Sequence, residues 1–577
     1  MFDLVIKGAT IVDGTGGAGF SGDIAVKDGV IAEIGRVRGP AHRTERTDGL
    51  LAAPGFVDIH SHYDGQVSWD TQLAPSFWHG VTTTIMGNCG VGFAPVRVDR
   101  REWLIGLMEG VEDIPGSALA DGIKWEWESF PEFLDAVGRR QYSMDVGAQI
   151  AHGALRAYVM GDRGARNEAA SEADIAAMGA LVREAQNAGA FGCSTSRTIV
   201  HRAVDGVPVP GTFAAHEELL ALARAVGESG HGILEVAPAG ILGEDLLAPE
   251  AELAWMIDIS AKTGCPITFL CGQNHRAPET WRMQLAECEK ARGMGARVTP
   301  QVFARALGTM SSLMSKQHPF MHTAIWAELA GLSHEERIGR LLGDADLRAA
   351  MAAQGCQNIF GYDVAFLNRP ETWESTFEVS DPPDYEPPPS ASVFAIAQRQ
   401  GRDPRAVALD IMLGDHGRRF VMHHGMGYAH GDLEAQREMM ASSGTVIGGA
   451  DGGAHVAIIC DASMPSFLLT HWARDRTRGA KLPLEFVIKK QTQDTARLFG
   501  MRDRGVLAPG MRADINLIDH ERLQLSKPYL VNDLPSGAPR LMQIADGILA
   551  TFVAGEKVRV GNEDTGARPG RLVRSAG

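Results

Sequence analysis

The sequence has few features of a secreted, membrane or nucleic-acid-binding protein. Its seven cysteines are scattered and none forms a CxxC pair, which favours a reducing cytoplasm over a disulfide framework. It contains no run of about 18 apolar residues, so we expect no membrane span. The first residues show neither the basic nor the apolar region of a signal peptide. The formal net charge of -16 disfavours nucleic acid and anionic membranes as partners.

Common signatures of nucleotide-binding and serine-dependent enzymes are also missing. The sequence has no phosphate-binding glycine loop, no dinucleotide-binding fingerprint and no GxSxG turn around a serine nucleophile. Its composition, 45% hydrophobic and 22% charged, is that of an ordinary globular protein, and its 577 residues predict two or three domains. We therefore expect a small molecule as the partner of any functional site.

The stretch 54–64, PGFVDIHSHYD, places two histidines at the end of a short apolar run. Side chains two positions apart lie on the same face of a strand, so His60 and His62 are predicted to point the same way. Two imidazoles on one face at the mouth of a buried strand form half of a metal site. The alternative is two ordinary polar residues at a strand end. The flanks favour the metal site, because the run is apolar up to the first histidine and polar after it.

Apolar strand patterns alternate with longer helical patterns through the centre of the chain, which indicates βα units. Both ends of the chain have strand-like patterns instead. We therefore expect one small β domain built from residues 1–54 and 505–577, around a central domain of residues 55–504 with a long insertion at about 303–419. Such an insertion can form a lid, an oligomer contact or a surface excursion. The predicted central strands are 54–64, 81–86, 145–150, 189–194, 232–236, 266–271, 297–302 and 446–451.

Two further residues at predicted strand ends belong to the candidate site. Asp451 ends the last apolar run, and in a closed barrel the first and last strands are neighbours, so we expect it beside His60 and His62. A carboxylate there can ligate a metal and take a proton from water; its alternative is a turn residue before Gly452. Cys89 lies in the string GNCG after the second strand. A thiolate is a strong zinc ligand, although a lone cysteine is often a small buried hydrophobe.

These motifs resemble the amidohydrolase superfamily and, within it, the N-acyl-D-amino-acid deacylases or D-aminoacylases. The strings HSHYDGQVSWD, HGVTTTIMGNCGVGFAP, AHGALR, PGTFA and ADGGAH carry the resemblance, which runs from residue 3 to about residue 560. It implies a TIM-like (β/α)8 barrel with a β-sandwich domain, one or two Zn²⁺ ions, and hydrolysis of an amide bond. It also implies metal-binding roles for His60, His62, Cys89 and Asp451, with Asp451 as the catalytic base and acid.

The sequence departs from this family in several places. The family has a histidine at the end of the fifth strand and another at the end of the sixth, where this chain has Glu235 and Cys271. Each can ligate a metal or serve in packing, and we keep Glu235 among the predicted metal ligands. The family holds the carboxylate of its substrate with an arginine shortly after the last-strand aspartate, but the first arginine after Asp451 is Arg474. The fourth strand also lacks the lysine that a carbamate-bridged relative needs.

Three more histidines are candidate substrate-binding residues because of their positions. His152 sits at a predicted strand end, His424 follows an apolar run, and His455 lies four residues after Asp451. Each can act as an acid, an oxyanion donor or a replacement ligand. We therefore expect a zinc-dependent hydrolase of a C–N bond that acts on a small molecule, as a monomer or a homo-oligomer. The alternatives are a hydrolase of a cyclic amide or ester-like bond in the same barrel, and a barrel that only binds a small ligand.

Overall fold

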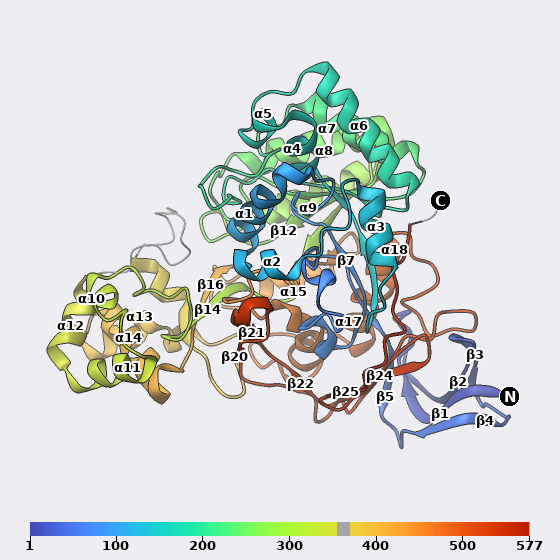
Figure 1. The fold of residues 1–577 in the computed structure, drawn as a ribbon. Coiled ribbons are helices and arrows are strands. Elements are labelled where there is room, and N and C mark those ends of the chain that lie inside the picture. The colour runs from blue at the N-terminus through green and yellow to red at the C-terminus, as the bar shows by residue number, and fades with distance from the viewer. Residues whose placement is uncertain (355–369, 576–577) are drawn as a thin grey trace.

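A barrel of parallel strands forms the centre of the computed structural model, which describes residues 1–354 and 370–575 (Figure 1). Its strands belong to a three-stranded sheet of order β6-β7-β8 and a six-stranded sheet of order β17-β13-β12-β11-β10-β9. β8 and β9 are separated by a single residue and together occupy one position, so the nine strands fill the eight positions of the barrel. The predicted TIM-like barrel is confirmed. Its strands are β6 (Phe56–Asp58), β7 (Val81–Met86), β8 (Asp145–Ala148), β9 (Ile150–Ala151), β10 (Gly192–Ser196), β11 (Ile233–Ala237), β12 (Ile267–Cys271), β13 (Val298–Val302) and β17 (Val446–Ile447).

The barrel closes through the loops that follow its first and last strands. Ser61 and Gly452 form an isolated parallel bridge. The Asp451 N–H donates to His60 O at 3.1 Å, and the His62 N–H donates to Gly452 O at 2.8 Å. These backbone hydrogen bonds join two segments that carry predicted site residues, so the closure of the barrel also aligns those residues.

Helices surround the barrel, and their sequences explain where they begin and which face they bury. At the start of α6, Ser171 and Asp174 form a reciprocal capping box. Met178, Val182 and Ala185, three or four positions apart, form the buried face of this helix. The main helices around the barrel are α1 (Arg101–Glu112), α2 (Gly116–Gly122), α3 (Phe130–Gly138), α4 (His152–Met160), α6 (Glu172–Asn187), α7 (His216–Glu228), α8 (Ala248–Thr263), α9 (Thr280–Gly293), α15 (Glu434–Ala441), α17 (Leu484–Lys490) and α18 (Gln493–Leu498).

The two ends of the chain meet in one nine-stranded sheet. Its order is β25-β24-β23-β18-β5-β1-β2-β3, with β4 paired to β1. The antiparallel pairing of β5 with β18 joins the N-terminal and C-terminal strands, which lie side by side in Figure 1. The domain boundaries that we predicted stay a prediction. The strands are β1 (Phe2–Ile11), β2 (Phe20–Lys27), β3 (Val30–Gly35), β4 (Ala41–Arg46), β5 (Leu51–Pro54), β18 (Ile515–Ile518), β23 (Ile548–Val553), β24 (Glu556–Val560) and β25 (Glu563–Asp564).

A helical lobe stands to one side of the barrel, between β13 and β17 in sequence (Figure 1). It has a hydrophobic core of its own, in which Leu341, Met351 and Met412 are fully buried. The antiparallel strands β14 (Leu307–Ser311), β16 (Val421–Met426) and β15 (Thr376–Glu378) adjoin it. Cys356, one of the seven cysteines, lies outside the described residues. The helices of the lobe are α10 (Ala324–Glu328), α11 (His334–Gly343), α12 (Ala345–Ala353), α13 (Val393–Gln400) and α14 (Pro404–Gly417).

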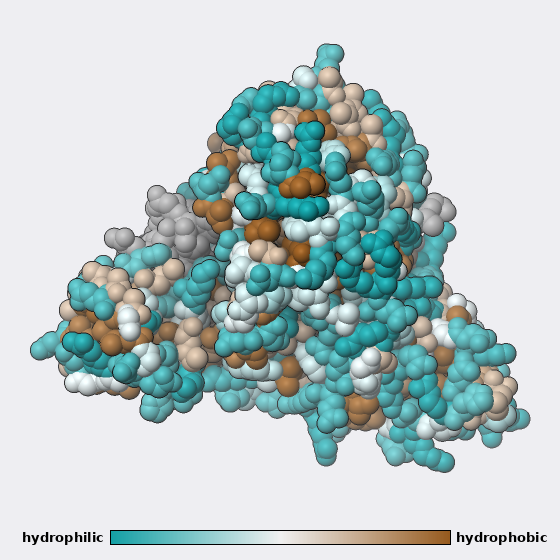
Figure 2. All heavy atoms as spheres, in the orientation of Figure 1, coloured by the Kyte–Doolittle hydropathy of each residue, from teal (hydrophilic) through white to brown (hydrophobic). Residues whose placement is uncertain are grey.

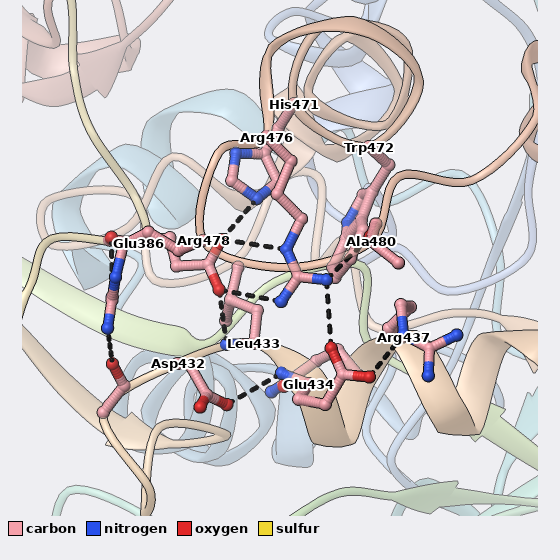
Figure 3. Close-up of polar contacts among 12 residues, drawn as sticks. Glu386, Asp432, Leu433, Glu434, Arg437, His471, Trp472, Arg476, Arg478 and Ala480 are labelled. Carbon is pink, nitrogen blue, oxygen red and sulfur yellow. Dashed lines mark hydrogen bonds and ion pairs between the residues drawn. The ribbon is translucent and has the colours of Figure 1, made fainter.

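A buried ion network joins the segment between β15 and α13 to the chain that follows β17 (Figure 3). The Arg476 guanidinium donates to both carboxylate oxygens of Glu386, at 3.0 and 2.9 Å, and also lies 3.1 Å from Glu434 on α15. His471 of the π-helix η7 (Leu468–Asp475) lies 3.0 Å from Glu386. Arg476 and Glu386 are almost fully buried, so the pair has little solvent screening, and the loss of either partner would leave a buried charge with only its weaker second contact.

Hydrophobic side chains on the face drawn in Figure 2 form small, separate patches within a mainly hydrophilic surface. Scattered patches of this kind are normal for a folded domain. Among the described residues, no helix combines the length and the hydropathy needed to cross a membrane.

Candidate metal centre

Three buried side chains from two neighbouring strand ends converge inside the barrel. His60 and His62 follow β6, and Cys89 follows β7. Cys89 Sγ lies 3.3 Å from His60 Nε2, and the centroids of the two imidazoles are 5.5 Å apart. One ligand atom from each of the three residues lies within 4.8 Å of the other two. Because β6 ends at Asp58, both histidines extend from the loop beyond the strand.

Asp451 lies beside the two histidines, across the closure of the barrel. Its Oδ1 is 3.4 Å from His60 Nε2 and 3.7 Å from His62 Nε2. Zinc bonds of about 2.0–2.3 Å in tetrahedral geometry place neighbouring donor atoms roughly 3.3–3.8 Å apart. Both separations, and that between Cys89 Sγ and His60 Nε2, fall in this range. His60, His62 and Cys89 thus form the group that could hold a metal ion, and Asp451 lies at a ligand-like separation from both histidines.

Two further side chains orient the histidines from behind. Gln301 Oε1 on β13 lies 3.2 Å from His60 Nδ1, and Glu112 Oε1 at the end of α1 lies 3.3 Å from His62 Nδ1. A proton on each Nδ1 would face these oxygens and leave Nε2, the atom that points at Asp451, free to bind a metal. A carboxylate or amide behind a ligating histidine has this role in many metal sites.

Burial dominates the electrostatics of the cluster. It lowers the pKa of His60 to about 4 and that of His62 to about 3, so both imidazoles are neutral at pH 7, the form that binds metals. Burial raises the pKa of the Cys89 thiol well above its ordinary range, and the nearby charges of Glu235 and Glu112 add to this. Several negative or ionisable groups thus share a buried space, and a bound divalent cation would stabilise their ionised forms.

Glu235 and Cys271 stand where the resembled family has histidines, and they have different surroundings in the structure. Glu235 on β11 points into the barrel, where its Oε2 accepts the Cys89 N–H at 2.8 Å and its Oε1 lies 3.8 Å from His60 Nδ1. Burial raises its pKa to about 8. Cys271 at the end of β12 instead contacts Gln284 Oε1 of α9 at 3.4 Å, in the packing between strand and helix. Only Glu235 of the two is therefore close to the cluster.

Three non-glycine residues of the site have left-handed backbones. The φ angles are 54° at Cys89, 48° at Asp451 and 46° at His455. Such conformations are uncommon for non-glycine residues, more so for cysteine than for aspartate or histidine, and they occur often at functional sites. Here they turn side chains at the strand ends inward, toward the cluster.

The three histidines predicted to bind substrate lie in different surroundings. His455 lines a cavity together with Asp451, and its Nε2 lies 3.6 Å from Glu112 Oε2. Both ring nitrogens of His152 are already engaged, Nδ1 with Thr195 at 2.9 Å and Nε2 with Glu218 at 2.8 Å.

His424 on β16 is fully buried and packs against the ring of Tyr428, with the centroids 4.5 Å apart. The cavity-lining Gly425 and Met426 follow it directly in the chain. The substrate-binding roles of the three histidines stay a prediction.

Sequence reasoning did not find Glu112, Gln301 or His201. Glu112 ends a helix outside any motif, and Gln301 lies on the strand with the weakest pattern. His201 lines the same cavity as His455 and follows β10, so its position after a barrel strand was the signal that could have identified it.

The cavity beside Asp451 measures about 470 Å³. A larger cavity of about 770 Å³ lies near the opposite ends of the strands, because Gly232, Pro266 and Arg297, which line it, directly precede β11, β12 and β13. Chemistry in such barrels takes place at the C-terminal strand ends, so the smaller cavity is the candidate active-site cleft.

Comparisons with known proteins agree with this arrangement. The model of the amidohydrolase family matches residues 47–559. An uncharacterised protein of Mycobacterium tuberculosis is 27% identical over 97% of this chain and 92% of its own length. The N-acyl-D-glutamate deacylase of Alcaligenes xylosoxydans xylosoxydans is 25% identical over 90% of this chain and 87% of its own. The structure of the N-acyl-D-glutamate deacylase of Bordetella bronchiseptica with zinc and a phosphonate inhibitor has the same fold (TM-score 0.65, 22% identity, 100% of both chains covered).

Proposed function

The chain belongs to the amidohydrolase family, and from this premise we propose that it is a zinc-dependent hydrolase of an amide bond in N-acyl amino acids or related N-acyl compounds. The observation that carries the proposal is the convergence of His60, His62, Cys89 and Asp451 at one end of the barrel. The relatives named as N-acyl-D-glutamate deacylases support the reaction type. The family resemblance inferred from the sequence motifs is confirmed.

His60, His62, Cys89 and Asp451 would hold the zinc, with Glu235 as a further candidate for a second ion. A buried oxygen without a hydrogen-bond partner supports the second position: Glu235 Oε1 lies beside the cluster, 3.8 Å from His60 Nδ1. When bound, zinc lowers the pKa of a coordinated water to about 7 and polarises a carbonyl oxygen.

Asp451 is the proposed base and acid. Its Oδ1 faces the two histidines, and its side chain is 18% exposed, so it reaches the cleft while the histidines do not. In the proposed reaction its carboxylate takes a proton from the attacking water and passes it to the leaving nitrogen. The C–N bond breaks, the hydroxyl of water goes to the acyl carbon, and the proton goes to the amine. His455 and His201, which also line the cleft, are the proposed contacts for the substrate carbonyl.

The volume of the cleft indicates the size of the substrate, and the state of the cysteines indicates the compartment. A cavity of about 470 Å³ suits a small-molecule substrate. The six cysteines in the described parts of the chain are all free and buried, which supports a reducing compartment, and we propose the cytoplasm. We also propose that the protein can form a homo-oligomer, which a measurement of its molecular mass in solution would test.

Substitution of Asp451 tests the proposal. Asp451→Asn keeps an oxygen that can face the metal but cannot accept a proton at neutral pH, so kcat should fall by about 10²–10⁴-fold while zinc content is retained. His60→Ala should instead lose most of the zinc. Turnover of N-acyl compounds and zinc content by mass spectrometry are the measurements. A kcat for Asp451→Asn within a few-fold of wild type, at unchanged zinc content, would exclude the proton-transfer role.

A further inference from the structure

The candidate cleft has predominantly apolar walls. Its residues come from the end of α1, the loops after β10, β11 and β17, the strands β14 and β16, and the turn after β14. Val204, one of its lining residues, is 62% exposed to solvent. The apolar lining residues are Val111, Val200, Ala203, Val204, Leu242, Leu307, Met426, Ile458 and Ile459.

The charged side chains around the cleft are mostly acidic. Apart from Asp451, the lining includes Glu109, Asp113 and Asp461, whereas Lys316 is its one lysine or arginine among the described residues. Lys316 is exposed and acts electrostatically on Asp113, so its charge is partly compensated within the cleft. Outside the metal centre itself, an incoming carboxylate would therefore meet the carboxylates of Glu109 and Asp113 and the single ammonium group of Lys316.

The arginines that could clamp a carboxylate are committed elsewhere. Arg305, buried beside the cleft, donates to Asp461 at 2.8 Å, to Cys460 O and to Ser463. Arg474, the first arginine after Asp451, donates to backbone oxygens of the segment 520–523 and lines a different cavity. A bidentate guanidinium is the usual partner of a bound carboxylate, and no cleft-lining residue in the described chain offers one.

We infer that the substrate is a neutral N-acyl amine or N-acyl amino alcohol with an apolar substituent, rather than an N-acyl amino acid that carries a free carboxylate. This inference rests on the proposed amide hydrolysis and specifies its substrate class. The apolar walls favour burial of an alkyl or aryl group, and Glu109 and Asp113 repel a carboxylate placed in the same cavity. At separations of several ångströms near a protein surface, one such repulsion changes affinity by about tenfold.

Matched ligands test the inference through binding as well as turnover. N-acetyl-leucinol and N-acetyl-leucine, each of both hands, differ only in a hydroxymethyl group against a carboxylate. Calorimetric titration into the zinc-loaded Asp451→Asn protein at pH 8 should show at least about tenfold tighter binding of the neutral ligand. Equal or tighter binding of the carboxylate, or no binding of N-acetyl-leucinol up to its solubility limit, would overturn the inference.

Turnover by the zinc-loaded wild-type protein separates this inference from the proposed function. Faster hydrolysis of N-acetyl-leucine than of N-acetyl-leucinol would leave the amide hydrolase standing and overturn the neutral-substrate inference. If the protein hydrolyses neither these two compounds nor any other N-acyl compound, the proposed function is overturned. The calorimetric comparison would still decide which ligand the cleft prefers.

A pair of charge reversals on α1 supplies the matched control. Glu109→Lys places a positive charge in the lining and should shift the preference toward the carboxylate ligand by about tenfold or more. Glu102→Lys makes the same change at an exposed position of the same helix, outside the lining, and should leave the preference within about twofold. If the ligand preference shifts equally in both variants, the effect comes from net charge, and the proposed selection of neutral substrates by the cleft is overturned.

Discussion

At the scale of single residues, the amide of Gln301 has the clearest untested role. Its Oε1 faces His60 Nδ1 at 3.2 Å, on the side of the ring opposite the cluster. Gln301→Leu should weaken zinc binding by about 10–100-fold, because the ring loses the group that fixes its tautomer and orientation. Competition with a chromogenic chelator measures the change in affinity.

A buried glutamine outside the cluster controls for general loosening of the barrel. Gln284 on α9 is also buried and contacts Cys271 rather than the histidines. Gln284→Leu should leave zinc affinity within a few-fold of wild type. An equal loss in both variants would mean that Gln301 acts through packing alone.

Individual residues also show how far the sequence could identify the site. His60, His62, Cys89 and Asp451 were found because each lies at or within a few residues of the end of an apolar run, in strings that resemble the family motifs. Glu112, Gln301 and His201 reach the same place from a helix end, a weakly patterned strand and a loop. Their contributions depend on the closure of the barrel, which no local pattern describes.

At the scale of elements, strands with strong apolar runs were predicted almost residue by residue. The stretch 81–86 became β7 without change, and 266–271 became β12 one residue shorter. The last stretch, 446–451, became a strand of only two residues, because its glycines and Asp451 turn away to form the site. The extent of the lobe could not be derived in the same way, since its helices pack on one another and not on the barrel.

The network around Glu386 predicts how acid weakens the contact between the segment before α13 and the chain after β17 (Figure 3). Burial alone would raise the pKa of Glu386, but hydrogen bonds from His471 and Arg476 outweigh it and lower the pKa to about 2. The folded pKa is thus below the ordinary value of 4.5. The stabilisation is complete above pH 4.5 and is lost as the pH falls from there toward about 2.

Replacement of this carboxylate should remove part of the pH dependence. At pH 7, Glu386→Gln should lower the free energy of unfolding by about 3 kcal/mol, because the buried Arg476 loses the carboxylate that binds it through two hydrogen bonds and keeps only Glu434. The difference from wild type should shrink as the pH approaches 3. Urea unfolding followed by near-ultraviolet circular dichroism measures both effects. Glu378→Gln, which breaks an exposed pair with Arg419, is the control and should cost less than about 1 kcal/mol; a similar loss there would refute the buried role.

At the scale of the whole molecule, zinc should contribute to global stability. A ligand that binds only the folded chain adds about 4 kcal/mol when its free concentration is a thousand times its dissociation constant. Removal of zinc by a chelator should therefore lower the melting temperature by several degrees, and added zinc should restore it. Differential scanning calorimetry at a fixed scan rate measures the shift. His62→Ala should show no such response; a full response in that variant would place the stabilising ion elsewhere.

The closure of the barrel also sets the order in which a growing chain can acquire its metal. His62 and Asp451 are 389 positions apart in the sequence, yet hydrogen bonds between their loops complete the last seam of the barrel. A ribosome must release most of the polypeptide before these loops can meet. Until then the nascent chain offers two histidines and a thiol without the carboxylate and without a closed wall around them. The complete donor set therefore arises only after residue 451 of the 577 has left the ribosome, and synthesis itself delays metal capture.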